Sequence, residues 1–144
     1  MNSTEKFLLA AVLTVLAAGC VHIGNPFSAM RPDFKAVPEQ ELREAARAIE
    51  QAVAEGKRDA EFANQGAVVL NDPIILQAIR TRAARREPLD AFLATGFCCE
   101  LPSGLVTTLR SGAYKKATTS MERDRHAMLV LGENNDRWAL YEGI

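Results

Sequence analysis

The chain has 144 residues, with 17 lysines and arginines against 18 aspartates and glutamates and a formal net charge of −1. This length suits one small domain, and the balanced charge gives no general attraction to nucleic acid. Two histidines and three cysteines leave few ligands for a metal ion and no framework of disulfides. We therefore expect no nucleic-acid partner, no metal and no cofactor.

The first twenty residues, MNSTEKFLLAAVLTVLAAGC, have the order of a secretion signal. Lys6 precedes an apolar run over residues 7–18, which is short for a permanent transmembrane helix. Small residues then precede Cys20, and this order resembles the lipobox of bacterial lipoproteins. The resemblance implies a signal peptide over 1–19, cleavage before Cys20 and lipidation of its sulfur. An ordinary cleaved signal with a coincidental cysteine is the alternative.

The lipidated Cys20 is expected to attach the protein to a membrane of the bacterial cell envelope, because several acyl chains on one residue give stable anchoring. Val21 follows it, and not the aspartate associated with retention in the inner membrane. By that resemblance we expect an outer-membrane protein that faces the periplasm. Residues 20–37 contain prolines and no sustained periodicity, so they are interpreted as a tether.

The first predicted helix begins at Pro38-Glu39 and ends before Gly56. Proline in the first turn and acids near it are typical of a helix start, and apolar residues then recur at spacings of three and four. Its narrow stripe is rich in alanine, which suits close packing against another helix of the core. A coiled coil with a partner is the alternative interpretation.

A second helix is predicted from Asn71-Asp72-Pro73, where a capping residue precedes proline. Pro88 is expected to break it, and a further short helix should run from Leu89 to Thr95 and end at Gly96. The residues expected to face the core are Ile75, Leu76, Ile79 and Ala83.

Four arginines crowd the far end of this second helix: Arg80, Arg82, Arg85 and Arg86. Cations near a helix C-terminus stabilise it electrostatically. The alternative is that they contact phosphates of an anionic lipid or glycolipid. The charge distribution agrees with a basic second half, since residues 31–79 hold six basic and nine acidic side chains and residues 80–137 hold ten and seven.

The last helix is predicted to run from Ala113 to Tyr141. Asn134 falls on its apolar face, so its amide should be partly buried and needs partners from elsewhere. Glu133 and Arg137 are four residues apart, which predicts an exposed ion pair. His126 lies among charged residues and is interpreted as solvated. The apolar face is expected to consist of Ala113, Ala117, Met121, Ala127, Leu131, Trp138 and Tyr141.

Two motifs, Gly96-x-x-Cys99-Glu100-x-x-x-Gly104-Leu105 and Asn134-x-x-Arg137-x-x-x-Tyr141, stand in this order in the chain. Together they resemble the YdbL-like family of small bacterial envelope proteins, over roughly residues 72–144. The resemblance implies an accessory or chaperone-like role in envelope assembly or lipid homeostasis. The motif residues Gly96, Glu100, Gly104, Asn134, Arg137 and Tyr141 would then be structural or bind a partner.

Cys98 and Cys99 lie in the turn of the first motif. Adjacent cysteines close only a strained ring, so we interpret them as packed or free thiols. A vicinal or intermolecular disulfide and a metal site are the alternatives. Cys99 stands where the family usually has glycine, and it would be strained if that position had a positive φ. Glu100 is expected to bind Arg137 or to cap backbone N–H groups, so that the two motifs meet.

The sequence thus predicts an all-α domain over residues 38–144, a bundle of three to four helices with a turn-rich connection at 96–112. We expect no enzymatic activity, because no general base or nucleophile pattern accompanies Glu100. The expected function is that of a lipid-anchored envelope protein that contacts other envelope proteins. A thiol-disulfide enzyme using Cys98 and Cys99, and a binder of anionic lipid through Arg80–Arg86, are the alternatives.

Overall fold

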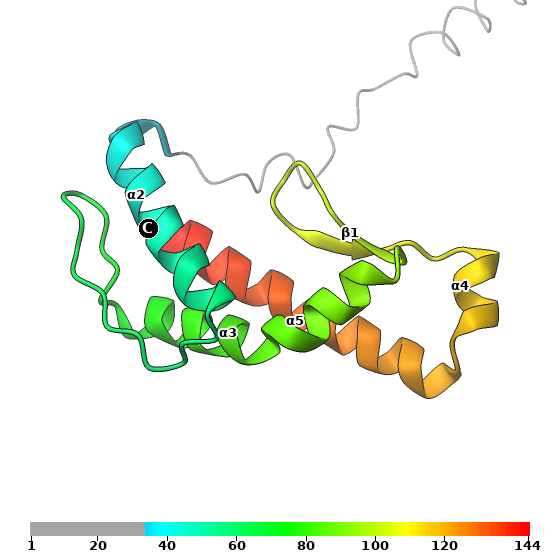
Figure 1. The fold of residues 1–144 in the computed structure, drawn as a ribbon. Coiled ribbons are helices and arrows are strands. Elements are labelled where there is room, and N and C mark those ends of the chain that lie inside the picture. Colours follow the sequence, from blue (N-terminus) through cyan, green and yellow to red (C-terminus); the bar gives the residue numbers. More distant parts are fainter. Residues whose placement is uncertain (1–33) are drawn as a thin grey trace, which may run out of the picture. The chain divides into compact units, whose positions relative to one another are not determined.

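The computed structural model describes residues 34–144, so Cys20, the signal and most of the tether lie outside the described residues. The expected helical fold is confirmed: three substantial helices are joined by a short helix and a small hairpin (Figure 1). In chain order the elements are η2 (Phe34–Ala36), α2 (Glu39–Ala54), α3 (Pro73–Ala94), β1 (Cys98–Glu100), β2 (Val106–Thr108), α4 (Gly112–Ala117) and α5 (Ser120–Gly143).

Helices α2 and α3 begin where the sequence predicts. Pro38 immediately precedes α2, and Gly56 follows its end with a φ of 66°. At the start of α3 the Asp72 side chain accepts a hydrogen bond from the Ile74 N–H at 2.7 Å, and Pro73 is the first helical residue. Because proline has no N–H to leave unpaired, the cap and the proline together suit this helix start.

The break predicted at Pro88 is wrong, since α3 continues through it to Ala94. Pro88 and Ala84, whose carbonyl loses its helical partner, are both exposed, so water can bond to that carbonyl. Ala83 before the proline and Leu89 and Phe92 after it are buried. Apolar burial on both sides therefore keeps the helix continuous.

The single last helix predicted from Ala113 is also wrong, because the chain forms α4 and then α5 with an interruption at Thr118 and Thr119. Thr119 begins α5 with a capping box: its hydroxyl accepts from the Glu122 N–H, and the Glu122 carboxylate accepts from the Thr119 N–H at 2.7 Å. This reciprocal cap satisfies two backbone donors and fixes the start of α5.

Helices α3 and α5 pack against each other and carry two separate apolar clusters. The first cluster joins α2, the early part of α3 and the end of α5, and it comprises Ala45, Ile49, Ala52, Val53, Val68, Leu70, Ile75, Ala78, Ile79 and Leu140. The second joins the late part of α3, the hairpin and α4, and it comprises Phe92, Cys98, Val106 and Tyr114. Early α3 thus meets late α5, so the two helices run antiparallel.

The apolar face predicted for the last helix is wrong in its first half. Met121 is 64% exposed and Leu131 is 52% exposed, whereas Glu133 is buried at 1%. Between the two apolar clusters, the buried layer of α5 is therefore charged. Among the described residues, no helix combines the length and the hydropathy needed to cross a bilayer.

Candidate functional site

The turn of the hairpin requires glycine at position 104. Strands β1 and β2 pair antiparallel with Glu100 opposite Val106, and the Gly104 N–H bonds to the Leu101 carbonyl at 2.9 Å. Gly104 has a φ of 77°, where other residues are strained. A Cβ at this position would also overlap the Tyr141 hydroxyl of α5. The first motif glycine, Gly96, likewise has a positive φ of 71°, directly after α3.

Asn134 of α5 completes the open edge of the hairpin. Its Oδ1 accepts from the Val106 N–H at 2.8 Å, and its Nδ2 donates to the Val106 carbonyl at 2.9 Å. The amide thus bonds to both backbone groups of one strand residue, as a neighbouring strand would. The expectation that Asn134 is partly buried and finds its partners outside its own helix is confirmed.

The two motifs meet at Arg137. Its Nη2 donates to the Glu100 carboxylate at 2.7 Å, and its Nη1 donates to the Gly104 carbonyl. The Tyr141 hydroxyl donates to the same carbonyl at 3.2 Å. The contact expected between Glu100 and Arg137 is therefore confirmed. Three α5 side chains, each one turn or nearly one turn apart, hold the hairpin.

Arg137 also belongs to a buried ionic network centred on Glu133. Glu133 Oε1 accepts from Arg137 Nε at 2.7 Å and from Arg82 Nε at 3.0 Å. Arg82 in turn donates to Glu50 of α2 at 2.8 Å. The prediction of an exposed Glu133–Arg137 pair is wrong, because Arg82 of α3 covers it. The network joins the hairpin, α5, α3 and α2, and it separates the two apolar clusters.

The network keeps Glu133 ionised. Burial by itself would raise the pKa of this carboxyl group, but the hydrogen bond from Arg137 and the charge of Arg82 outweigh burial and lower its pKa. Burial would also lower the pKa of Arg137, yet Glu133 and Glu100 raise it. All charges of the buried layer are thus compensated, which suits a structural role.

The four arginines of α3 do not form one exposed patch. Arg82 is buried, and each of the four bonds to a carboxylate of this chain. The pairs are Arg80 with Asp59 at 3.2 Å, Arg82 with Glu50 and Glu133, Arg85 with Asp136, and Arg86 with Asp90 at 2.7 Å. Contact of these arginines with an external anion would have to displace carboxylates that already neutralise them.

Cys98 is buried in the second apolar cluster, and Cys99 on the opposite face of β1 is half-buried. Burial, followed by the neighbouring Cys99 and Glu100, raises the pKa of the Cys98 thiol above its usual range. An activated thiolate would need a lowered pKa. No residue other than glycine has a positive φ among those described, so Cys99 is not strained by its backbone.

Cys98→Ser should lower the free energy of unfolding by about 1–2 kcal/mol, because it places a hydroxyl in an apolar cluster. Cys99→Ser, the matched control on the outer face of the same strand, should cost less than about 0.5 kcal/mol. Chemical denaturation followed by circular dichroism measures both. Equal losses of stability in the two variants would contradict the assignment of Cys98, and not Cys99, to the second apolar cluster.

The prediction that His126 is solvated is wrong. Its ring stacks on Phe92 of α3 with 3.8 Å between ring centroids, and its Nδ1 lies 3.1 Å from the Tyr114 hydroxyl. Tyr114 belongs to α4, so the histidine ties α4 and α3 to α5. The sequence offers no sign of this contact, because it joins residues from three helices.

A largely apolar groove lies on the described surface away from the motif junction. It lies between Pro88, Ala91 and Phe92 of α3 and Met121, Met128 and Leu129 of α5, and has a volume of about 870 Å³. Met128 at its wall is 67% exposed. Arg125 at its rim bonds to the sulfur of Met121 and to no carboxylate among residues 34–144. We call this hollow the α3–α5 groove.

Within the part of the chain that the structure describes, no three histidine, cysteine or acidic side chains come together as metal ligands would. Comparison of the chain with protein-family models, curated proteins and solved structures found no match. The resemblance to the YdbL-like family therefore remains a prediction from the two motifs of the sequence.

Proposed function

We propose that this protein is a lipid-anchored, non-catalytic component of the bacterial cell envelope that binds an amphipathic helix of another envelope protein. The lipobox-like signal supports the anchor at Cys20, and the two YdbL-like motifs support an accessory or chaperone-like role. The motif residues hold the hairpin on α5, so they would serve the binding surface by stabilising it. The buried Cys98 with its raised pKa disfavours the alternative of a thiol-disulfide enzyme.

The observation that carries the proposal is the α3–α5 groove. Met121 and Met128 are seven residues apart on α5 and strongly exposed, which is the spacing of side chains that receive a partner helix. Methionine side chains adapt to partners of varied shape. The groove is also lined by Arg125, Glu122 and Asp124, so its charges can pair with charged residues on the polar flank of that helix. We therefore assign the groove to the apolar face of an amphipathic helix.

Photo-crosslinking in bacteria that express the full chain tests this proposal. A photoreactive residue at position 128 should yield a crosslinked product, and mass spectrometry should map it to an amphipathic segment of another envelope protein. Ile74 is the matched control, since it is also 67% exposed but lies at the start of α3, outside the groove. The Leu129→Glu variant should abolish the product at position 128.

A product that maps to a second copy of this chain or to lipid would contradict the proposed occupant. The same product at positions 74 and 128 would contradict the groove as its site. Amide signals or circular dichroism of the Leu129→Glu variant must match the unmodified protein, so that loss of the product reports the groove itself.

Cys20→Ala should release the protein from membranes into the soluble fraction, because the described domain contains no membrane-spanning helix. Mass spectrometry should find diacylglycerol and acyl groups on Cys20 of the unmodified protein. Cys99→Ala is the control and should remain membrane-bound. A mature Cys20 without lipid in the unmodified protein would refute the anchor, and the mass of the Cys20→Ala protein distinguishes an uncleaved precursor from a lipidated form.

A further inference from the structure

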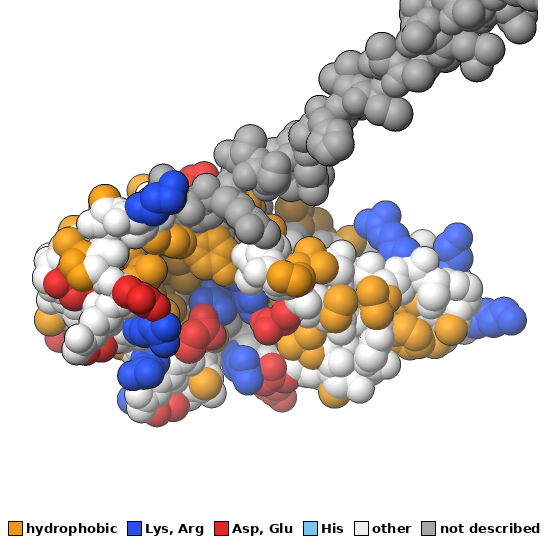
Figure 2. All heavy atoms as spheres, turned by 90° about the horizontal axis from the view of Figure 1, so that it is seen from above, with side chains coloured by type: hydrophobic (Ala, Val, Ile, Leu, Met, Phe, Trp, Pro, Cys, Tyr) orange, Lys and Arg blue, Asp and Glu red, His pale blue; other side chains and the backbone are white. Residues whose placement is uncertain are grey.

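The end of the described domain around α4 is basic. Between Leu101 and Met121 the sequence contains Arg110, Lys115 and Lys116 and no acidic residue. Figure 2 shows Lys and Arg side chains gathered at the end where α4 lies. The positive charge of the second half of the sequence is thus concentrated here and not along α3, where carboxylates neutralise the arginines.

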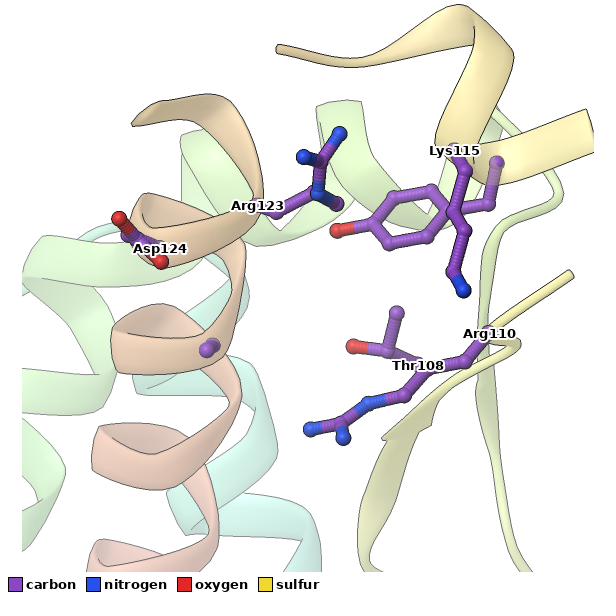
Figure 3. A pocket seen from close by; sticks show the side chains of 7 residues that line it. Thr108, Arg110, Lys115, Arg123 and Asp124 are labelled. Carbon is purple, nitrogen blue, oxygen red and sulfur yellow. The ribbon is translucent and has the colours of Figure 1, made fainter. Parts of the chain in front are cut away.

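Three of these cations line one pocket, which we call the basic pocket. Arg110 comes from the segment after β2, Lys115 from α4 and Arg123 from α5, and Thr108 of β2 adds a hydroxyl. In Figure 3 Arg110 and Lys115 extend into the space between these elements, Arg123 leans from α5 toward α4, and the Asp124 carboxylate points away. The pocket has a volume of about 300 Å³.

None of the three cations forms an ion pair with a carboxylate among residues 34–144. Arg123 donates to the Thr118 carbonyl at 2.5 Å, which uses one of its five N–H donors. Asp124 also lines the pocket but forms no ion pair with them, and like charges gathered without an ion-pair partner repel one another. An anion in the pocket would relieve this repulsion and accept hydrogen bonds from the remaining N–H donors.

We propose that the basic pocket binds a phosphate group. Phosphate oxygens match the planar fork of arginine, and a lysine adds a compact positive charge to the same anion. The Thr108 hydroxyl offers a neutral donor for a further oxygen. The phosphate can belong to a lipid headgroup or to a soluble compound, and both present the same chemistry. This inference goes beyond the proposed function, because none of the three cations lines the α3–α5 groove.

Nuclear magnetic resonance of the full chain in neutral-detergent micelles tests the proposal. In one arm inorganic phosphate is added, with acetate at equal ionic strength as the control anion. In the other arm the micelles contain phosphatidylglycerol or, at the same mole fraction, oleate, which is anionic but has no phosphate. The amide signals of residues 108–123 should shift with phosphate or with phosphatidylglycerol, and not with acetate or oleate.

The double variant Arg110→Gln/Lys115→Gln should weaken the interaction by at least about tenfold, since two charged donors are lost. Arg47→Gln/Lys57→Gln removes an exposed arginine and an exposed lysine from the opposite part of the domain and should leave the affinity unchanged within about twofold. Unaltered signals from the buried residues of the hairpin show that each variant is folded.

The arms also distinguish the sources of the phosphate. Shifts with phosphatidylglycerol alone assign the pocket to lipid headgroups, and shifts with inorganic phosphate assign it to soluble phosphate compounds. Absence of shifts in both arms overturns the proposal. Equal responses to acetate or oleate, or equal weakening in the control variant, also overturn it, because the interaction would then be a general effect of charge. Crosslinking at Met128 is independent of all these outcomes.

Discussion

Glu133→Gln should lower the free energy of unfolding by about 3–5 kcal/mol, because it leaves the buried guanidinium groups of Arg82 and Arg137 without their shared carboxylate. Glutamine has nearly the shape of glutamate, so the loss would come from charge and not from a cavity. Chemical denaturation at neutral pH followed by circular dichroism measures the effect. We expect one of the largest single-residue costs in the domain.

Glu100→Gln is the matched control for Glu133→Gln. Glu100 binds the same arginine at the same distance of 2.7 Å, but its side chain is 57% exposed. Water screens this pair, so its loss should cost less than about 1 kcal/mol. Similar costs for the two variants would show that water reaches Glu133, and they would contradict its role as the buried centre of the network between the two apolar clusters.

The pH dependence of stability gives a second measure of the same carboxylate. The pKa of Glu133 in the folded protein is below its ordinary value of 4.5, so its contribution is complete above that value and is lost as the pH falls through the folded pKa. The unmodified protein should therefore lose stability below about pH 4.5, and Glu133→Gln should lose less. Glu55 and Glu122 also have lowered pKa values, so some dependence should remain in the variant.

The sequence predicts those features of the domain that depend on neighbouring residues or on the hydrogen-bond needs of a single side chain. Asp72-Pro73 marks the start of α3 because a cap and a proline act on adjacent backbone groups. The contact between the motifs is predictable because buried polar side chains need hydrogen-bond partners. Both the amide on the apolar face and the arginine one turn later need such partners. Asn134 found the backbone of Val106, and Arg137 found Glu100.

The errors arose where distant parts of the chain decide the outcome. A glutamate four residues before an arginine has the pattern of an exposed pair, and only Arg82, 51 residues away, makes Glu133 a buried residue. Apolar packing on both sides of Pro88 likewise outweighs a local preference. The break before α5, in contrast, is visible in the sequence, because Thr119-x-x-Glu122 has the pattern of a capping box.

The candidate surfaces were the least predictable feature. The α3–α5 groove exists because Met121, which the sequence places on the apolar face, is exposed together with Met128 once α5 turns its charged side inward. The basic pocket exists because the hairpin and α4 bring Arg110 and Lys115 to Arg123. Neither arrangement follows from the spacing of residues within one helix, since each surface combines elements from different parts of the chain.

Gly104→Ala should lower the free energy of unfolding by about 2–3 kcal/mol. The positive φ of this position costs alanine about 1–2 kcal/mol, and the new Cβ would displace the Tyr141 hydroxyl and its hydrogen bond to the Gly104 carbonyl. Gly112→Ala is the control, because no atom lies within 4 Å of the added Cβ and the backbone has no positive φ. That substitution should be neutral or slightly stabilising.

Tyr141→Phe separates the two causes. It removes the overlapping hydroxyl, and on its own it should cost about 1 kcal/mol for the lost hydrogen bond. In the double variant Gly104→Ala/Tyr141→Phe the Cβ no longer meets an oxygen, so the combined cost should be smaller than the sum of the single costs by roughly 1 kcal/mol. If the cost of the double variant equalled the sum of the single costs, backbone strain would be the sole reason that position 104 requires glycine. A Gly104→Ala cost no larger than that of Gly112→Ala would contradict both causes, and the hairpin would then be held on α5 by Asn134 and Arg137 without a close approach at Gly104.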